Sequence, residues 1–247
     1  MSSWAATWRV STERPIVSAL ALGLTVLLFD ATMALAFPPY KLTDADTAEP
    51  LTIEARLGLV QYQVERDKES YSSPLVRLNL GLTAHTEILA EAEYSQETDR
   101  VEEAAVGGKW IPWPGSLAFG AEVLTLLPRS GESDYGVEAT LLMTVREASL
   151  LTHANLGAIE DRRPSEHESG WKGGVLLEWL QAQWRPGVEL FAKQLNSEPE
   201  QASAGIGAIF PFDSLDVRIG VRAGLTNAAP DLTASIWISG NFPLSGQ

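Results

Sequence analysis

The residues from Leu215 to Leu225 alternate strictly between apolar and polar or glycine positions. The apolar positions are Leu215, Val217, Ile219, Val221, Ala223 and Leu225, and the intervening ones are Asp216, Arg218, Gly220, Arg222 and Gly224. Successive side chains of a β-strand point to opposite faces, so this stretch predicts a strand with one apolar and one charged face. A run of roughly 9–11 such residues can cross a bilayer within a closed barrel, with apolar side chains toward lipid.

The same alternation recurs along the chain in twelve segments. They are residues 51–62, 74–82, 86–94, 103–113, 117–127, 137–146, 150–158, 171–183, 188–194, 202–210, 215–225 and 232–240. Segments 103–113 and 171–183 alternate less regularly, and Pro112 should mark a strand end because proline cannot donate to a strand ladder. The sequence therefore predicts an all-β fold, a twelve-stranded antiparallel up-and-down transmembrane β-barrel.

The connections between these segments alternate between long and tight. The long, mostly polar ones are residues 65–73, 96–102, 129–134, 159–169, 196–201 and 226–231, and the tight ones are 83–85, 113–116, 147–149, 184–187 and 211–214. Membrane barrels have short periplasmic turns on one rim and longer loops on the other. This alternation is what strands that thread a membrane up and down require.

Aromatic residues gather at the predicted strand ends. Trp110, Trp113, Trp184, Phe210, Phe212 and Phe242 fall near the tight turns or the chain end, and Tyr62, Tyr71, Tyr94, Tyr135 and Trp171 fall near the long connections. Aromatic side chains favour strands in general, but their position at the ends favours two girdles at the membrane interfaces.

The first part of the chain divides into two segments. Residues 1–36 have a basic start with Arg9 and Arg14, an apolar run over residues 16–29 and a small-x-small motif at Ala34-Leu35-Ala36, which together predict a cleaved signal peptide. An uncleaved N-terminal anchor is the alternative. Residues 37–50 contain three prolines and no apolar period, so we expect an extended lead-in ahead of a barrel over residues 51–247.

The composition excludes several classes of function. The 247 residues carry a net charge of -14, which argues against nucleic acid or an anionic membrane surface as a partner. Cysteine is absent, so disulfides, thiolate chemistry and Cys-ligated metals are excluded. A soluble barrel such as a lipocalin also alternates with period two, but such barrels typically have eight strands and point their apolar side chains inward. In this chain the charged side chains fall on one face of each segment and the apolar ones on the other, which favours apolar side chains facing lipid outside the barrel.

Short motifs resemble a family of Gram-negative outer-membrane barrels described as transporters of the MetA pathway of phenol degradation. They are Pro38-Pro39-Tyr40, Thr43-Asp44-Ala45-Asp46-Thr47, Leu51-Thr52-Ile53-Glu54, and Gly81-Leu82-Thr83 with Glu87. The chain departs from the family at Ala48-Glu49-Pro50, where a glycine is usual, and at its end, where residues 243–247 follow Phe242. The resemblance implies an outer-membrane barrel that passes small hydrophobic or aromatic compounds.

The polar faces predict a lumen of Glu, Arg and Lys, in which both signs of charge are interspersed. The candidate lining residues are Glu54, Arg56, Arg77, Glu91, Glu93, Lys109, Glu122, Glu138, Arg146, His153, Glu178, Arg218 and Arg222. If the second and third strands pair around Thr83 and Ala84, Arg77 lies opposite Glu91, within reach of a cross-strand ion pair. Such pairs either line a solute path or fill the interior, and twelve strands fall between the filled small barrels and the open porins.

The lead-in of residues 37–50 is placed to enter the periplasmic mouth as a plug, because Pro38-Pro39 holds it extended. A loose periplasmic tail is the alternative that we favour, since chain ends are usually disordered unless they are tied down.

An enzyme would need a nucleophile beside an oriented base. The chain has no Gly-x-Ser-x-Gly motif and no two histidines at ligand spacing. His167 lies in an acidic stretch, residues 160–168, that could bind a cation or activate water, but a solvated charged loop is the simpler account. We therefore expect an outer-membrane channel without catalysis, cofactor or metal. Its partners would be outer-membrane lipid, the assembly machinery and a small solute. A closed structural barrel is the alternative.

Overall fold

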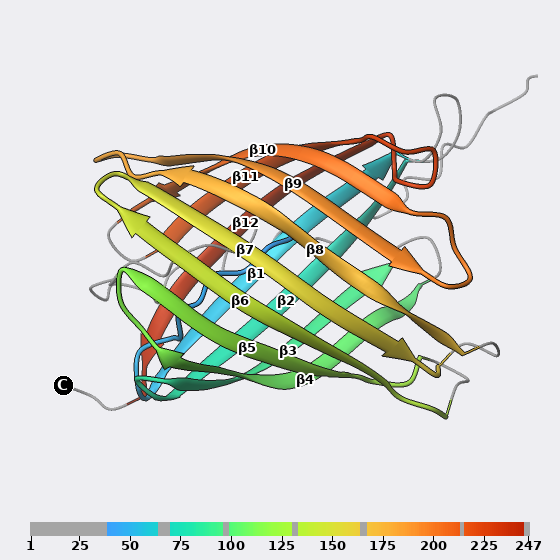
Figure 1. Cartoon of the computed structure of the whole chain (residues 1–247), viewed down its shortest axis with the longest axis horizontal. Helices are drawn as coiled ribbons and strands as arrows, with labels where there is room; N and C mark the ends of the chain where they lie inside the picture. The colour runs from blue at the N-terminus through green and yellow to red at the C-terminus, as the bar shows by residue number, and fades with distance from the viewer. Residues whose placement is uncertain are drawn as a thin grey trace, which may run out of the picture.

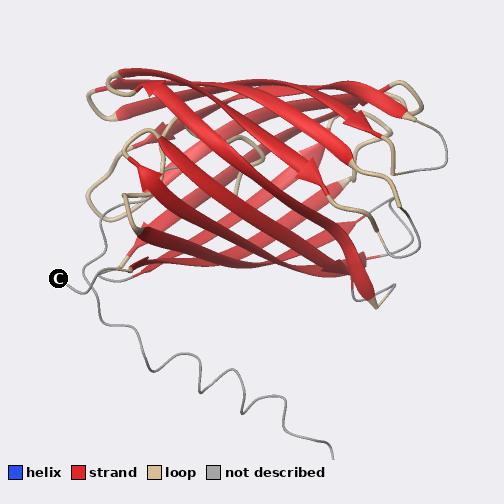
Figure 2. Ribbon diagram, turned by 90° about the horizontal axis from the view of Figure 1, so that it is seen from below, coloured by secondary structure: helices blue, strands red, loops and turns tan. Residues whose placement is uncertain are grey.

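The computed structural model describes residues 39–63, 70–95, 99–129, 133–163, 167–212 and 215–244, and these ranges form a barrel of β-strands (Figures 1 and 2). The strands are β1 (Thr52–Gln63), β2 (Ser70–Thr83), β3 (Thr86–Ser95), β4 (Arg100–Trp113), β5 (Leu117–Leu126), β6 (Gly136–Glu147), β7 (Leu150–Asp161), β8 (Glu168–Trp179), β9 (Arg185–Leu195), β10 (Gln201–Pro211), β11 (Leu215–Gly224) and β12 (Leu232–Pro243). The predicted signal peptide, residues 1–36, lies outside the described residues. Within the described ranges, no helix is long and apolar enough to span a membrane.

Each strand pairs antiparallel with its neighbours in the chain, and β1 pairs with β12 to close the barrel. The prediction of a closed twelve-stranded up-and-down barrel is therefore confirmed. The predicted bounds are wrong at some ends: β8 stops at Trp179 rather than at Gln183, and β2 begins at Ser70, four residues before Pro74. Next to Pro112, the register between β4 and β5 shifts, because this residue lacks an N–H.

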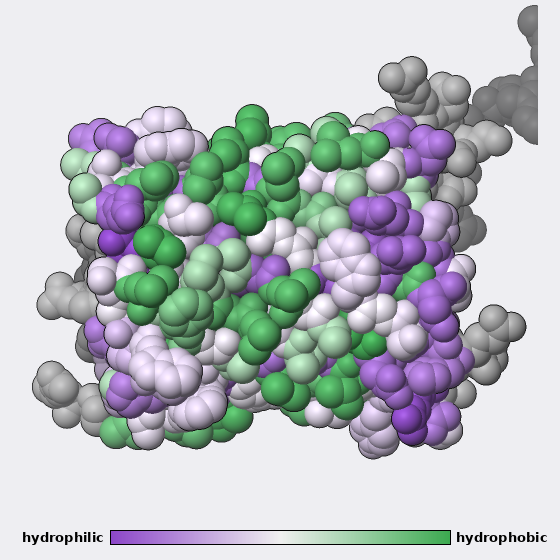
Figure 3. Space-filling view, viewed as in Figure 1, coloured by the Kyte–Doolittle hydropathy of each residue, from purple (hydrophilic) through white to green (hydrophobic). Residues whose placement is uncertain are grey.

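The outer face of the barrel is apolar around its middle. Every strand contributes an exposed aliphatic side chain: Leu57, Val76, Ile88, Val106, Val123, Leu141, Leu156, Val175, Leu190, Ile206, Ile219 and Ile236. Hydrophobic residues occupy the central zone of the visible face, and hydrophilic residues gather toward its two ends (Figure 3). An apolar surface this extensive on a closed barrel is suited to hydrocarbon.

Aromatic side chains border this apolar zone on both rims. We call the rim that carries the tight connections the turn side and the other rim the loop side. On the turn side Trp113 and Phe212 are exposed, and Trp184 stacks on Phe210 with ring centroids 6.2 Å apart. On the loop side Tyr135 and Trp171 are exposed. This arrangement agrees with the predicted girdles.

The inner face is not lined by ionised side chains alone, which corrects the expected lumen of Glu, Arg and Lys. Buried apolar side chains point inward among the charges: Leu89, Ile111, Leu124, Leu142, Leu176, Ile209 and Trp237. Trp237 fits because its partner in the β1–β12 register is Gly58, where an added Cβ would lie 2.2 Å from the indole. A lumen narrowed in this way can bury apolar groups as a soluble core does.

Residues 39–50, here called the inner segment, lie inside the barrel rather than outside it as a loose tail. Figure 1 draws them in blue within the outline of the strands. The chain reverses direction at the turn side, where Leu51 has a φ of 57° and its N–H donates to the carbonyl of Gly81 at 2.8 Å. This left-handed conformation is uncommon for leucine and is held by the surrounding pairing. It directs the inner segment back into the lumen.

We expect Leu141→Arg to destabilise the barrel strongly, because Leu141 is 65% exposed at the middle of β6. A charge at mid-membrane on the lipid face costs about 2–4 kcal/mol, against about 0–1 kcal/mol near an interface. Urea unfolding in phospholipid vesicles measures this cost, and Leu117→Arg at the turn-side start of β5 is the matched control. Equal losses in the two variants would contradict the membrane orientation.

Candidate functional site

The wall of the barrel holds the inner segment mainly by its backbone. The N–H groups of Lys41 and Leu42 donate to Oε1 of Glu189 at 2.6 and 2.8 Å, and the N–H of Ala45 donates to Oγ1 of Thr144 at 2.8 Å. Hydrogen bonds from N–H groups to a carboxylate are stronger than those between neutral groups. The inner segment is therefore fixed by several β-strands at once.

Asn155 of β7 and Glu87 of β3 add two further anchors. Asn155 accepts the N–H of Thr43 at 2.8 Å and donates from Nδ2 to the carbonyl of Thr43 at 2.9 Å, so it binds both polar groups of that residue. Glu87 accepts the N–H of Ala48 at 2.6 Å. These contacts satisfy backbone groups that would otherwise be buried without partners.

The start of the inner segment packs against glycines on the lumen face. A Cβ at Gly207 of β10 would lie 2.7 Å from Pro39, a Cβ at Gly220 of β11 would also lie 2.7 Å from Pro39, and one at Gly187 of β9 would lie 2.4 Å from the hydroxyl of Tyr40. Larger residues at these positions would therefore displace the segment. Tyr40 also forms a buried apolar cluster together with Leu42, Leu176 and Phe191.

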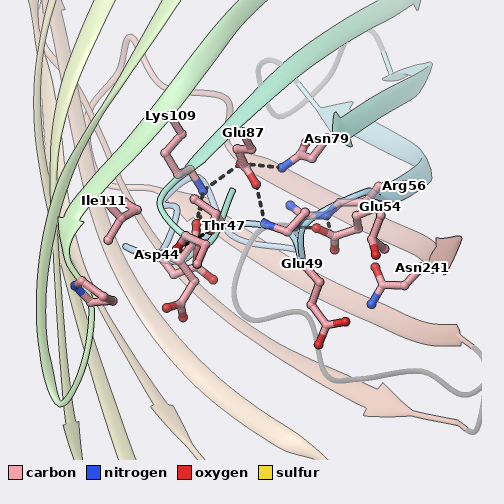
Figure 4. A pocket seen from close by; sticks show the side chains of 15 residues that line it. Asp44, Thr47, Glu49, Glu54, Arg56, Asn79, Glu87, Lys109, Ile111 and Asn241 are labelled. Atoms are coloured by element: carbon pink, nitrogen blue, oxygen red, sulfur yellow. Dashed lines mark hydrogen bonds and ion pairs between the residues drawn. The ribbon is translucent and has the colours of Figure 1, made fainter. Parts of the chain in front are cut away.

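A cavity of about 210 Å³ lies on the turn side of the inner segment (Figure 4). Lys109 of β4 faces it and forms ion pairs with Glu87 at 3.3 Å and with Asp44 of the inner segment at 3.5 Å. Its ammonium also donates to the carbonyl of Asp46 at 3.0 Å. Lys109 therefore joins the wall to the inner segment by charge as well as by hydrogen bonding.

A larger cavity of about 690 Å³, the loop-side cavity, lies on the other side of the inner segment. Pro39, Tyr40 and Lys41 of the inner segment contribute to its lining, and the walls mix charged residues with apolar ones such as Leu126 and Ile159. The volume of this cavity is in the range of sites for small organic molecules, although its lining is more charged than is usual for them.

Buried charges of the wall are arranged in pairs. Arg77, whose side chain is 2% exposed, donates to Glu91 at 2.9 Å and to Glu122 at 2.8 Å. The register places Arg77 directly opposite Glu91, so the predicted cross-strand pair is confirmed. A buried ion needs such partners, because its desolvation is otherwise uncompensated.

A second group joins β1 to β11. Arg56 donates to Glu54 through two nitrogens at 2.8 and 2.6 Å, and Arg218 lies 3.5 Å from Glu54 and 2.9 Å from Asp216. These contacts couple the closing strand pair to its neighbour. These ion pairs restrict movement of β1 relative to β11 in this part of the wall.

His153 belongs to a buried chain of hydrogen bonds. Its Nδ1 lies 2.9 Å from Oγ1 of Thr144, and its Nε2 lies 3.1 Å from Oε2 of Glu178. The arrangement resembles a hydroxyl–imidazole–carboxylate relay, but all three side chains are fully buried and Thr144 accepts the Ala45 N–H. A hydroxyl that is inaccessible and already bonded is not available for attack on a substrate. In the described part of the chain, no group of His, Asp and Glu could hold a metal ion.

The structure places all the predicted lumen residues on the inner side of the wall. Glu91, Glu93, Glu138 and Arg222 line the loop-side cavity. Glu54, Arg56 and Lys109 line the turn-side cavity, and Arg146 pairs with Asp46 of the inner segment. Arg77 and Glu122 form the pairs described above, as do Arg218 and, with His153, Glu178.

The prediction included Lys109 and Arg146 as lining residues, but it missed the uncharged residues that bind the backbone of the inner segment. Thr144 and Asn155 occupy the polar parity of their strands, but uncharged side chains at such positions gave no sign of a partner. Asp44 falls in the predicted lead-in and in a motif of the family resemblance, and it lies buried against Lys109. The inward glycines 187, 207 and 220 were a usable signal, since small residues on a lumen face leave room for another chain.

Comparison with known proteins supports the fold. No protein-family model matches the chain, and a search of curated proteins gives no match. An outer membrane channel from Pseudomonas putida F1 superimposes with a TM-score of 0.63 and 10% sequence identity, covering 82% of this chain and 100% of that one. The KdgM porin gives a TM-score of 0.58 at 12% identity, with 77% and 99% covered, and its complex with disordered oligogalacturonate gives 0.56 at 11% identity, with 79% and 99% covered.

We expect Arg77→Met to lower the free energy of unfolding by about 3–5 kcal/mol, because it leaves Glu122 buried without its main partner. Glu91→Gln should cost about 1 kcal/mol or less, since the side chain of Glu91 is 28% exposed to the lumen. Urea unfolding in vesicles compares the two. If Glu91→Gln proves as costly as Arg77→Met, the buried pair does not dominate.

Proposed function

We propose that the protein is an outer-membrane channel through which a small solute diffuses, with the inner segment as its constriction. The observation that carries this proposal is the loop-side cavity of about 690 Å³ within the closed barrel. A barrel whose lumen were filled for stability alone would not keep a cavity of this size lined with both charged and apolar groups.

The inner segment separates this cavity from the smaller one on the turn side. Lys41 lines the loop-side cavity, whereas Thr47 and Ala48 line the turn-side cavity. A solute that crosses the barrel must pass between the segment and the wall or displace the segment. The residues beside this passage, which we propose set selectivity, include Glu54, Arg56, Glu91, Glu93 and Arg222.

The proposed solute is small and has apolar or aromatic character. The resemblance to phenol-degradation transporters suggests such compounds, and the mixed lining with Phe191, Ile159 and Trp237 suits them. The structurally similar porins also support a channel.

A structural barrel with a closed lumen is the second candidate. The paired charges of Arg77 and Arg218 and the anchored inner segment favour it, because they fill and stiffen part of the interior. The two candidates differ in solute flux.

For catalysis we propose no role, since Thr144, His153 and Glu178 are inaccessible to substrate.

Deletion of residues 39–48 should raise single-channel conductance several-fold in planar bilayers, because it joins the two cavities. Wild-type protein should show a small but measurable conductance and should pass small solutes in proteoliposome swelling assays. The Arg100→Gln variant, which changes an exposed loop-side residue, is the control. Absence of current and of flux in both the wild type and the deletion variant would end the channel proposal and favour the structural barrel.

The conductance should rise with pH. Burial raises the pKa of Asp44 in the docked inner segment to about 7, whereas an exposed aspartate has a pKa of about 4. Between these values the docked state binds more protons than the released state, so raising the pH through this window weakens docking. Asp44→Asn should remove most of the difference in conductance between about pH 5 and about pH 8.

Glu160→Gln is the control for this pH experiment, because Glu160 is exposed at the loop-side end of β7, away from the inner segment. This variant should keep the wild-type pH profile. An unchanged profile in Asp44→Asn would show that Asp44 does not control the constriction.

A further inference from the structure

Some of the positively charged side chains around the loop-side cavity form ion pairs with carboxylates, and others do not. Arg163 pairs with Asp161 at 2.7 Å, Lys172 pairs with Glu138, and Arg222 pairs with Glu189 at 2.8 Å. Across the described part of the chain, no ion pair involves the ammonium group of Lys41 or of Lys193. Both side chains line this cavity.

Lys193 lies in an unfavourable electrostatic position. It is the register partner of Lys172 across β8 and β9, and both side chains line the cavity. Like charges directly opposite each other on neighbouring strands destabilise the pair. The carboxylate of Glu138 compensates Lys172, so the uncompensated charge is that of Lys193.

Lys41 enters the same region from the inner segment. Enclosure within the barrel lowers the pKa of Lys41, and the positive charges of Arg222 and Lys193 lower it further. The carboxylates that oppose this effect are those of Glu93, on β3, and Glu189. The backbone of Lys41 is held by Glu189, which lies four residues before Lys193 on the same face of β9, so both lysines enter the cavity beside this strand.

Glu189 has little capacity left for either lysine side chain. Its Oε1 accepts the backbone N–H groups of Lys41 and Leu42, and its Oε2 accepts Nε and Nη2 of Arg222 at 3.3 and 2.8 Å. A carboxylate that already accepts four donors has no lone pair left for another. An anion from outside the chain could form direct ion pairs with Lys41 and Lys193, whereas the carboxylates that line the cavity form none with them in the described part of the chain.

Apolar side chains stand on both sides of Lys193. Phe191 and Leu195 lie two residues before and after it on β9, so all three point to the same face and line the cavity. Ile159 and Trp237 add further apolar lining. The ammonium groups thus lie next to surfaces that suit a hydrocarbon body rather than a sugar.

We propose that the loop-side cavity is a binding site for a small amphipathic monocarboxylate. Its carboxylate lies between the ammonium groups of Lys41 and Lys193, and its apolar body packs on Phe191 and Leu195. Glu91, Glu93 and Glu103 also line the cavity and disfavour a second negative charge on the solute. The proposal rests on the channel function and assigns it a solute class.

The test uses the purified full-length barrel in detergent micelles and follows 4-fluorobenzoate by ¹⁹F NMR. Line broadening should reveal binding that benzoate competes away, whereas acetate, which lacks the apolar body, should compete poorly. The neutral analogue 4-fluorobenzyl alcohol should bind more weakly after subtraction of its partition into empty micelles. Lys41→Gln and Lys193→Gln should each weaken binding of 4-fluorobenzoate by roughly tenfold, and Lys193→Arg should retain it.

Arg100→Gln is the matched control, since it removes one positive charge on the loop side from a residue outside the cavity lining. Heat-modifiable gel migration checks that every variant is folded. Binding that is unchanged in the Lys41→Gln/Lys193→Gln double variant, or equally tight for the neutral analogue, would overturn the site. Lysine-dependent binding without any current or flux would keep the site and end the channel proposal, so the two failures are distinguishable.

Discussion

The structure depends on the closing contact between β1 and β12. From Thr52 opposite Pro243 to Gln63 opposite Leu232, the first and last strands pair along their whole length, so the sheet has no edge. In hydrocarbon no water is present to bond an open edge, and each unpaired backbone group there costs several kcal/mol. Closure therefore allows an exterior of Leu, Val and Ile to face lipid.

This closure also determines where the inner segment begins. Because β1 starts on the turn side, the residues before it arrive at that mouth of the barrel, and the left-handed Leu51 reverses them into the lumen. The wall offers acceptors at several heights, from Glu87 on β3 to Glu189 on β9. The backbone groups of the strands are paired with one another. The polar side chains on the inner face are therefore available to bind the backbone of the inner segment.

Much of the fold could be predicted from the sequence, because a strand has a period of two and the two faces meet different media. The stretch around Arg218 and Arg222 shows this plainly, and the register of Arg77 against Glu91 followed from a tight turn. Strand ends were less predictable, as at Trp179, because pairing continues or stops according to partners that lie elsewhere in the sequence.

The contents of the lumen were less predictable than its wall. An inward Trp237 depends on Gly58 of the other end of the chain, and the position of the inner segment depends on Asn155 and Thr144, which carry no charge. Such contacts join residues far apart in sequence. Local periodicity specifies the face on which a side chain lies but not what it meets there.

The wall binds the inner segment largely through backbone N–H groups, so the residues that hold the segment in place do not depend on which side chains it presents to the cavity. The N–H groups that are bound by Glu189, Asn155 and Thr144 are present in every residue except proline. The side chain of Lys41 can therefore be replaced while these hydrogen bonds remain. The wall of a membrane barrel is hard to alter, because each residue there also faces lipid or a register partner. Side chains of the inner segment that form no ion pair with the described part of the wall, such as that of Lys41, can therefore be exchanged without any change in the strands of the barrel.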